Sequence, residues 1–321
     1  MTLKKFYNNK SILITGGTGS IGTQLSIYLL KNFKIKKLIL YSRDEQKHYI
    51  QKKLLNDDRV RYFIGDVRDL PRLNMAFNTV DYVIHAAAQK HVDLSEYNPH
   101  ECIKTNIYGS ENVIQASIQN KIKKCLLIST DKAVNPINLY GASKLAAEKI
   151  FLNANYLSGN AGTIFSVARY GNVLGSKGSI IPFFSKLIKE NKKIPITDKS
   201  MTRFWINYDD AVKLVLNSLM SSKAFETYVP ILKSMKILDL VNIMKQDAKL
   251  EIIGIKKGEK IHEELISSEE TAYTKKKKNY YIINLNNKAN NKKIFDKQYN
   301  SSNFLVKKLS KNYLEIIKTF I

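Results

Sequence analysis

The chain has few of the residues that mark secreted, metal-binding or membrane-spanning proteins. Its 321 residues include two cysteines, Cys102 and Cys125, too few for a disulfide framework or a cysteine metal cluster. No run of about 18 apolar residues occurs, so we expect no helix that crosses a membrane. The N-terminal segment leads directly into the strand-like run "SILITGG" at 11–17, without the apolar stretch of a signal peptide. These absences predict a reduced, cytoplasmic protein without a membrane partner.

Arginine is also scarce, although the chain is strongly basic. The formal net charge is +24, yet only seven of the 52 basic residues are arginines. A charge of this size is typical of proteins that bind nucleic acids. The lysines are scattered, however, and accompany abundant Asn and Ile, a composition that AT-rich coding alone would produce. We therefore expect no nucleic-acid partner, and we give more weight to Arg43, Arg169 and Arg203, which fall within candidate motifs.

The pattern along the chain predicts an α/β protein. Through about residue 175, short β-rich runs alternate with amphipathic helical stretches, which is typical of a Rossmann-like, doubly wound parallel sheet. Beyond residue 176 this alternation breaks, and we expect a smaller, partly interleaved C-terminal α/β domain for the substrate. The predicted division assigns 1–176 and about 204–232 to the dinucleotide-binding domain, and about 177–203 and 233–321 to the substrate domain.

A glycine-rich loop follows the first predicted strand. In "LITGGTGSIG" at 13–22, Gly16, Gly19 and Gly22 match the G-x-x-G-x-x-G variant of the dinucleotide-binding fingerprint. Such glycines permit a tight turn and a close approach of the backbone to a pyrophosphate at the helix N-terminus. The loop predicts a nicotinamide cofactor. We expect three further loop residues to contact it, namely Thr18, Ser20 and Ile21.

The end of the second predicted strand favours NADP over NAD. An NAD enzyme places a carboxylate about 20 residues beyond the last glycine, whereas this chain has Ser42 and Arg43 in "YSRDEQK" at 41–47. A guanidinium suits a 2′-phosphate, although a solvated surface arginine is the alternative. Further cofactor contacts are predicted near the ends of the second, third and fourth strands, at Asp44, Lys47, Asp66, Val67, Ala86 and Ala87.

The segment "STDKAVNPINLYGASK" at 129–144 holds the candidate catalytic residues. Tyr140 and Lys144 lie one turn apart on one face of a predicted helix. We expect the lysine to lower the pKa of the tyrosine and to contact the nicotinamide ribose. The tyrosinate can then remove a proton from a substrate hydroxyl as hydride leaves the same carbon.

An acid and a second base, Asp131 and Lys132, precede this pair. Loss of hydride from C4 of a sugar leaves a 4-ketone, which makes the C5 hydrogen acidic. A base can then remove that hydrogen while an acid protonates the departing C6 hydroxyl, which is a 4,6-dehydration. Lysine needs a depressed pKa to act as the base, and we expect burial beside other cations to supply it. Alternatively, the two residues only cap the helix or pair with one another.

Together these motifs resemble those of the extended short-chain dehydrogenase/reductase family. More closely, the chain is similar to the inverting UDP-N-acetylglucosamine 4,6-dehydratases that begin pseudaminic acid synthesis for flagellin glycosylation. The resemblance covers roughly 10–266 and includes "HAAAQKHV", "VARYGNVLGSKGSIIPFF", "IPITDKSMTRFWI" and "IIGIKKGEKIHEEL". It implies a UDP-sugar substrate, the product UDP-2-acetamido-2,6-dideoxy-β-L-arabino-hexos-4-ulose for a surface glycan, and a homo-oligomer, hexameric in similar enzymes.

The resemblance also implies individual roles. Asp131, Lys132 and Tyr140 would be catalytic, with Lys144 in support and Thr130 near the substrate O4. Lys256 stands where the family usually has arginine, which would weaken binding of the diphosphate. The implied substrate contacts are Lys90, Asn172, Thr197, Arg203, Lys256 and Glu259.

Three other functions remain open. Retaining 4,6-dehydratases and dehydratase/5-epimerases of the same group carry methionine in place of Tyr140, and a nucleotide-sugar 4-epimerase needs neither Asp131 nor Lys132. A Rossmann protein that binds NADP without turnover would not need the four catalytic groups. We expect no metal, because the H-E-x-x-H zinc motif that His262 and Glu263 could begin has Ile266 in place of its second histidine.

Overall fold

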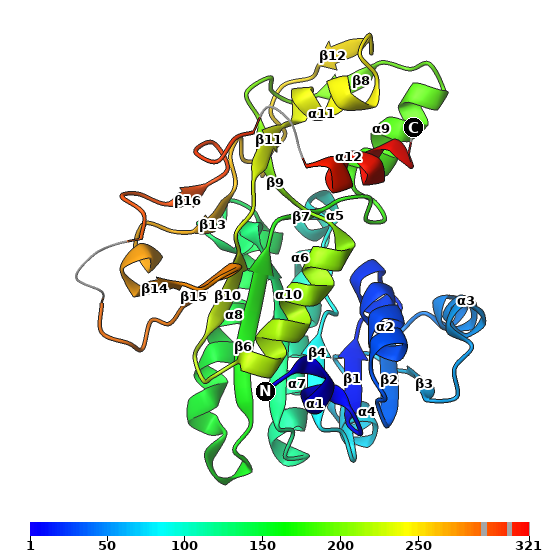
Figure 1. Ribbon diagram of the computed structural model, residues 1–321, viewed down its shortest axis with the longest axis vertical. Helices are drawn as coiled ribbons and strands as arrows, with labels where there is room; N and C mark the ends of the chain where they lie inside the picture. Colours follow the sequence, from blue (N-terminus) through cyan, green and yellow to red (C-terminus); the bar gives the residue numbers. More distant parts are fainter. Residues whose placement is uncertain (290–293, 307–309, 321) are drawn as a thin grey trace.

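A nine-stranded sheet forms the body of the protein (Figure 1). The computed structural model describes residues 1–289, 294–306 and 310–320. The strand order is β14-β15-β10-β6-β5-β4-β1-β2-β3. All pairs from β3 to β10 are parallel, whereas β15 pairs antiparallel with both β10 and β14. The strands are β1 Ser11–Thr15, β2 Lys37–Ser42, β3 Val60–Ile64, β4 Tyr82–His85, β5 Lys124–Thr130, β6 Ile164–Tyr170, β10 Thr227–Pro230, β14 Thr274–Lys276 and β15 Tyr280–Ile283.

Helices cover both faces of this sheet, so its central strands are almost wholly buried. Alternate residues of a strand point to opposite faces. Ile12 and Ile14 of β1 therefore pack into the core that contains α2 and α10, while Leu13 packs into the core that contains α4, α7 and α8. The helices are α1 Leu3–Tyr7, α2 Ser20–Asn32, α3 Glu45–Leu55, α4 Leu70–Phe77, α5 Val92–Tyr97, α6 Pro99–Ile103, α7 Gly109–Gln119, α8 Leu139–Leu157 and α10 Tyr208–Ser221. A π-helical turn, Lys104–Tyr108, links α6 to α7.

A smaller lobe lies at one end of the sheet (Figure 1). It has its own apolar core, which includes Trp205, Phe184 and Met235. One strand joins the two lobes, because Phe204 and Ile206 pack into the sheet core while Trp205 between them packs into the smaller core. The elements here are β7 Asn172–Val173, α9 Ile180–Lys189, β8 Ile194–Ile196, β9 Thr202–Ile206, β11 Ser234–Lys236, α11 Ile237–Met244, β12 Leu250–Ile252 and α12 Lys311–Lys318. The remaining pair, β13 Glu264–Ile266 and β16 Tyr299–Asn300, packs into the core of the large sheet.

The architecture confirms the predicted α/β class with a Rossmann-like parallel sheet. The division of the chain into two domains stays a prediction. Within the predicted substrate domain, however, β14 and β15 extend the large sheet, because β15 pairs with β10 along its whole length. In the described part of the chain, none of the helices is both long and apolar enough to cross a membrane.

Candidate active site

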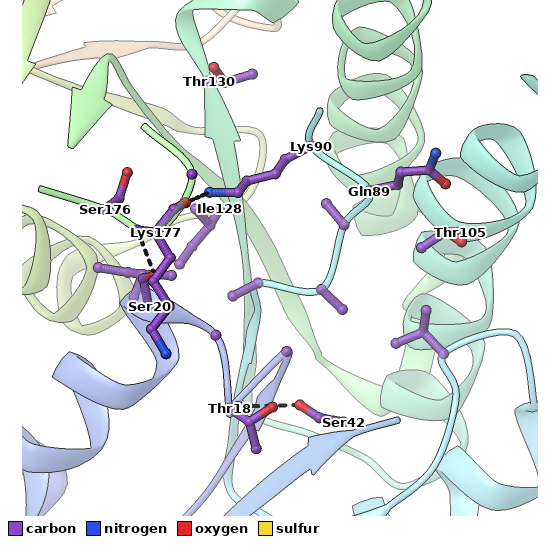
Figure 2. A pocket seen from close by; sticks show the side chains of 18 of the residues that line it. Thr18, Ser20, Ser42, Gln89, Lys90, Thr105, Ile128, Thr130, Ser176 and Lys177 are labelled. Atoms are coloured by element: carbon purple, nitrogen blue, oxygen red, sulfur yellow. Dashed lines mark hydrogen bonds between the residues drawn. The ribbon is translucent and has the colours of Figure 1, made fainter. Parts of the chain in front are cut away.

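A cavity of about 710 Å³ opens where the parallel strands end (Figure 2). The carboxyl edge of a doubly wound sheet is the usual place for a ligand. Every predicted cofactor residue except Gly22 lines this cavity. The lining therefore includes Gly16, Thr18, Gly19, Ser20, Ile21, Ser42, Arg43, Asp44, Lys47, Asp66, Val67, Ala86, Ala87, Tyr140 and Lys144.

The glycine loop packs tightly against the neighbouring strand ends and leaves the start of α2 facing the cavity. Gly16 has a φ of +65°, and a Cβ there would lie 2.8 Å from the backbone nitrogen of Ala87. Gly19 caps α2 without a side-chain hydrogen bond, so the first amides of the helix face the cavity as an anion site. Gly22 serves packing instead, since a Cβ there would lie 2.6 Å from the Gly17 carbonyl oxygen. The sequence analysis missed Gly17, where a Cβ would meet the Ile14 carbonyl oxygen at 2.9 Å.

Two basic side chains stand near the end of β2. Arg43, with 59% of its side chain exposed, lies 3.5 Å from Asp66, and Lys47 lies 2.8 Å from Asp44. Burial acts to raise the pKa of Asp66, but hydrogen bonds from Arg68 and the charge of Arg43 hold it below its usual value. Both basic groups can therefore reach an anion at this end of the cavity.

Tyr140 and Lys144 lie on the first turns of α8 and face the cavity. The Lys144 ammonium donates a hydrogen bond of 2.8 Å to the Ile128 carbonyl oxygen. Burial lowers the pKa of Lys144 to about 8. Burial also raises the pKa of Tyr140 to about 12, with Lys132 acting in the opposite direction. The pKa of Tyr140 is thus raised overall, because desolvation outweighs the charge of Lys132. The lowering of this pKa by Lys144 stays a prediction.

Asp131 and Lys132 lie on a 3₁₀ turn directly after β5, beside the cavity lining. Lys132 Nζ is 3.0 Å from Asp131 Oδ1 and 3.1 Å from Glu263 Oε1. The Thr130 hydroxyl donates to Asp131 Oδ1 at 2.9 Å. Burial raises the pKa of the Asp131 carboxyl, which suits an acid that must hold a proton.

The expected depression of the Lys132 pKa is wrong. Burial does act to lower it, but the negative charges of Asp131 and Glu263 outweigh burial, and the pKa is raised. The expectation named only cations as neighbours of this lysine, whereas the carboxylate of Glu263 also lies beside it and raises its pKa. Lys132 therefore rests as an ammonium held between two acidic groups.

The predicted substrate residues are only partly brought together. Lys90 lines the cavity and donates to the Lys177 carbonyl oxygen at 2.9 Å (Figure 2). Arg203 lies outside the cavity lining, 3.9 Å from Glu263. The other four lie outside the cavity lining, namely Asn172, Thr197, Lys256 and Glu259.

Three residues near the site were not predicted as site residues, because their partners there lie far away in the chain. Lys260 donates to the Val134 carbonyl oxygen at 2.6 Å, and Lys177 donates its backbone N–H to Ser20 at 3.4 Å. Glu263 was considered only as part of an incomplete zinc motif. Within the described residues, no group of three potential ligands could hold a metal ion.

The fold, the glycine loop and the Tyr140–Lys144 pair define an extended short-chain dehydrogenase/reductase. The chain belongs to the family described as polysaccharide biosynthesis protein, whose model matches residues 12–285. The resemblance stated from the motifs is thereby confirmed.

Relatives with named activities cover most of the chain. A UDP-N-acetylglucosamine 4,6-dehydratase (inverting) of Campylobacter jejuni is 53% identical over 86% of this chain and 83% of its own. A UDP-glucose 4-epimerase of Rickettsia bellii is 42% identical over the same shares.

Solved structures share the fold. Pen from Bacillus thuringiensis has a TM-score of 0.89 at 36% identity and covers 98% of each chain. DesIV from Streptomyces venezuelae, a dTDP-glucose 4,6-dehydratase solved with NAD and TYD, has a TM-score of 0.71 at 21% identity, over 78% of this chain and 86% of its own.

Proposed function

We propose that this chain is a UDP-N-acetylglucosamine 4,6-dehydratase that inverts C5. The observation that carries this proposal is the Asp131–Lys132 pair beside Tyr140, which supplies an acid and a base beyond those that oxidation requires. The product would be UDP-2-acetamido-2,6-dideoxy-β-L-arabino-hexos-4-ulose. The 53% identical relative with this named activity supports it.

A nicotinamide cofactor fits the cavity. The free amides of α2 and the tight turn at Gly16 suit a pyrophosphate, and DesIV, with the same fold, was solved with NAD. A bound nicotinamide would supply the hydride chemistry that the reaction needs, with removal of hydride from C4 and its return to C6. We propose NADP in particular, because Arg43 and Lys47 can hold a 2′-phosphate where NAD enzymes have a carboxylate.

The chain's own groups then divide the proton transfers. Tyr140 takes the proton of the C4 hydroxyl, assisted by Thr130, while Lys144 orients the ribose. Lys132 takes the C5 proton, which is acidic beside the 4-ketone. Asp131 gives its proton to the departing C6 hydroxyl, as its raised pKa favours.

Inversion follows from where the proton returns. The intermediate is flat at C5, so the configuration of the product depends on which face receives the returning proton, and we propose the face opposite to the one that lost it. Tyr140, where retaining relatives have methionine, supports the inverting type. A 4-epimerase is the second candidate, favoured by the 42% identity to an epimerase, but epimerisation leaves Asp131 and Lys132 without a role.

The biological setting is part of the proposal. We propose a cytoplasmic homo-oligomer that makes a precursor of pseudaminic acid or a related surface glycan. Lys90, Arg203 and the remaining predicted contacts would bind the UDP-sugar; the remaining contacts are Asn172, Thr197, Lys256 and Glu259.

Proton NMR of the reaction in deuterium oxide tests this function. Purified protein with UDP-N-acetylglucosamine should form a 6-deoxy-4-keto sugar with one deuterium at C5, in the L-arabino configuration in the earliest spectra. An initial D-xylo product would identify a retaining enzyme. Conversion to the C4 epimer without loss of the C6 hydroxyl would identify an epimerase.

A further inference from the structure

The buried carboxylate of Glu263 lies among three cations beside the catalytic turn. Its side chain is 2% exposed, and its Oε1 lies 3.1 Å from Lys132 Nζ and 3.9 Å from Arg203 Nε. Its Oε2 lies 3.9 Å from Lys260 Nζ and accepts no hydrogen bond from any described residue. A buried carboxylate costs several kcal/mol to desolvate unless it is paired. Its closest cation, Lys132, is the group that acts at C5 in the proposed mechanism.

A segment distant in the chain fixes the position of this carboxylate. The Glu263 backbone N–H donates to the Ser301 hydroxyl at 2.9 Å, and the Ser301 backbone N–H donates to the Glu263 carbonyl oxygen at 2.8 Å. These bonds continue into the pairing of β13 with β16. Lys132 Nζ is consequently held from two sides, by Asp131 from its own turn and by Glu263 from the C-terminal segment.

The two carboxylates differ in their affinity for a proton. Burial raises the pKa of Asp131. Burial also acts to raise that of Glu263, but the charges of Lys132, Arg203 and Lys260 outweigh it and lower the pKa. Glu263 therefore stays ionised next to Lys132, while Asp131 is the carboxyl that can hold and release a proton. With Tyr140 and Arg203, these are the charged and titratable groups that face Lys132.

We propose that Glu263 is a positioning residue for proton transfer at C5, which holds Lys132 in place and stabilises the ammonium that forms there. This inference rests on the proposed function. In the step, the Lys132 ammonium first passes one proton to the Asp131 carboxylate, 3.0 Å away. The C5–H bond then breaks, its electron pair forms the enolate of the 4-ketone, and the proton joins the neutral Lys132 amine. The C6–O bond then breaks, and the hydroxyl leaves as water with the proton of Asp131. Removal of hydride from C4 depends on Tyr140 and should not need Glu263.

The test compares Glu263→Gln with Glu264→Gln as the matched control. Glu264 is the adjacent residue, and its carboxylate accepts a hydrogen bond from the Asn135 amide at 2.8 Å, away from Lys132. Deuterium uptake at C5 is measured against pH, and absorbance at 340 nm reports hydride transfer in the first turnover. In Glu263→Gln the C5 rate at high pH should fall about 10- to 100-fold, as loss of one charge-assisted hydrogen bond implies.

The pH profile separates positioning from a merely structural role. The C5 rate rises with pH as Lys132 loses its proton. In Glu263→Gln, which lacks the charge, this rise should move to lower pH by about one unit or more. Hydride transfer in Glu263→Gln should stay as in the native protein, and so should the pH profile of Glu264→Gln. Glu263→Asp, which keeps the charge, should keep the native position of the rise.

Three outcomes would overturn the inference. The first is an unshifted pH profile of the C5 rate in Glu263→Gln, and the second is an equal loss of hydride transfer and C5 exchange in that variant. The third is failure of both Glu263 variants to fold when Glu264→Gln folds, which would show a structural role. The native protein checks the proposed function separately. If it does not exchange C5 at all, the function is wrong and the inference falls with it, whereas native exchange with unaffected variants refutes the inference alone.

Discussion

Replacement of the buried Arg169 tests how much its ion pairs contribute to the stability of the fold. Its side chain, 3% exposed at the end of β6, lies between Glu148 of α8 and Glu270. It donates to the two Glu148 oxygens at 3.1 and 2.6 Å and to the two Glu270 oxygens at 2.8 and 3.0 Å. A fifth bond of 2.9 Å reaches the Leu265 carbonyl oxygen. Substitution by methionine would remove all five bonds while filling much of the same space.

We expect Arg169→Met to lower the free energy of unfolding by about 3–5 kcal/mol, the usual cost of leaving buried partners of an ion pair uncompensated. Combining it with Glu148→Gln and Glu270→Gln should recover most of that loss, because the remaining buried groups are then neutral. Lys213→Met is the matched control. It breaks a half-exposed helical pair with Asp209 at 2.6 Å and should cost below about 0.5 kcal/mol.

Urea unfolding followed by the fluorescence of Trp205, the one tryptophan and fully buried, measures these changes.

In the native protein Arg169 holds the Glu270 pKa below its usual value against the effect of burial. Native stability from this group is thus present above the unfolded pKa and lost as the pH falls. In the variant the charge of Arg169 is gone, and we expect burial to outweigh the remaining effects of the Ser267 backbone and Lys149 and to raise the Glu270 pKa. Acidification then favours the folded state, and the deficit should shrink from pH 7 to pH 5. A deficit no larger than that of the control, or one independent of pH, would refute this reasoning.

Three further predictions concern the site. The purified unsubstituted protein should release NADP(H) when it is denatured, and release of NAD alone would contradict the assignment of NADP. Arg43→Asp should shift cofactor preference towards NAD. Lys132→Ala should accumulate bound reduced cofactor without product, measured at 340 nm, whereas Tyr140→Phe should largely lose that signal, and identical behaviour would show that the roles are misassigned. Because burial lowers the pKa of Lys144 from 10.5 to about 8, the unfolded chain binds more protons between these values and native stability should rise with pH there. Lys144→Met should abolish this rise in urea unfolding of the cofactor-free protein at pH 7.5 and 9.5, and a variant that keeps it would place the effect elsewhere.

Local spacing was enough to predict much of the fold and the cofactor site. Gly16, Gly19 and the start of α2 belong to one strand–turn–helix unit, and Tyr140 and Lys144 belong to one helix face. Such relations depend only on the pitch of a helix and the geometry of a turn, which hold wherever the segment lies. The alternation of buried runs and helices likewise predicted the parallel sheet, because both faces of its strands must be covered.

Contacts between distant segments needed the tertiary structure. Glu263 approaches Lys132, and Glu270 approaches Arg169, across more than a hundred residues of chain, and nothing in the spacing of either segment predicts those meetings. The sequence identified Lys132 by its chemical type but gave the wrong direction for its pKa. That direction depends on the balance of burial against the charges around the ammonium, and only the folded chain determines which charges those are.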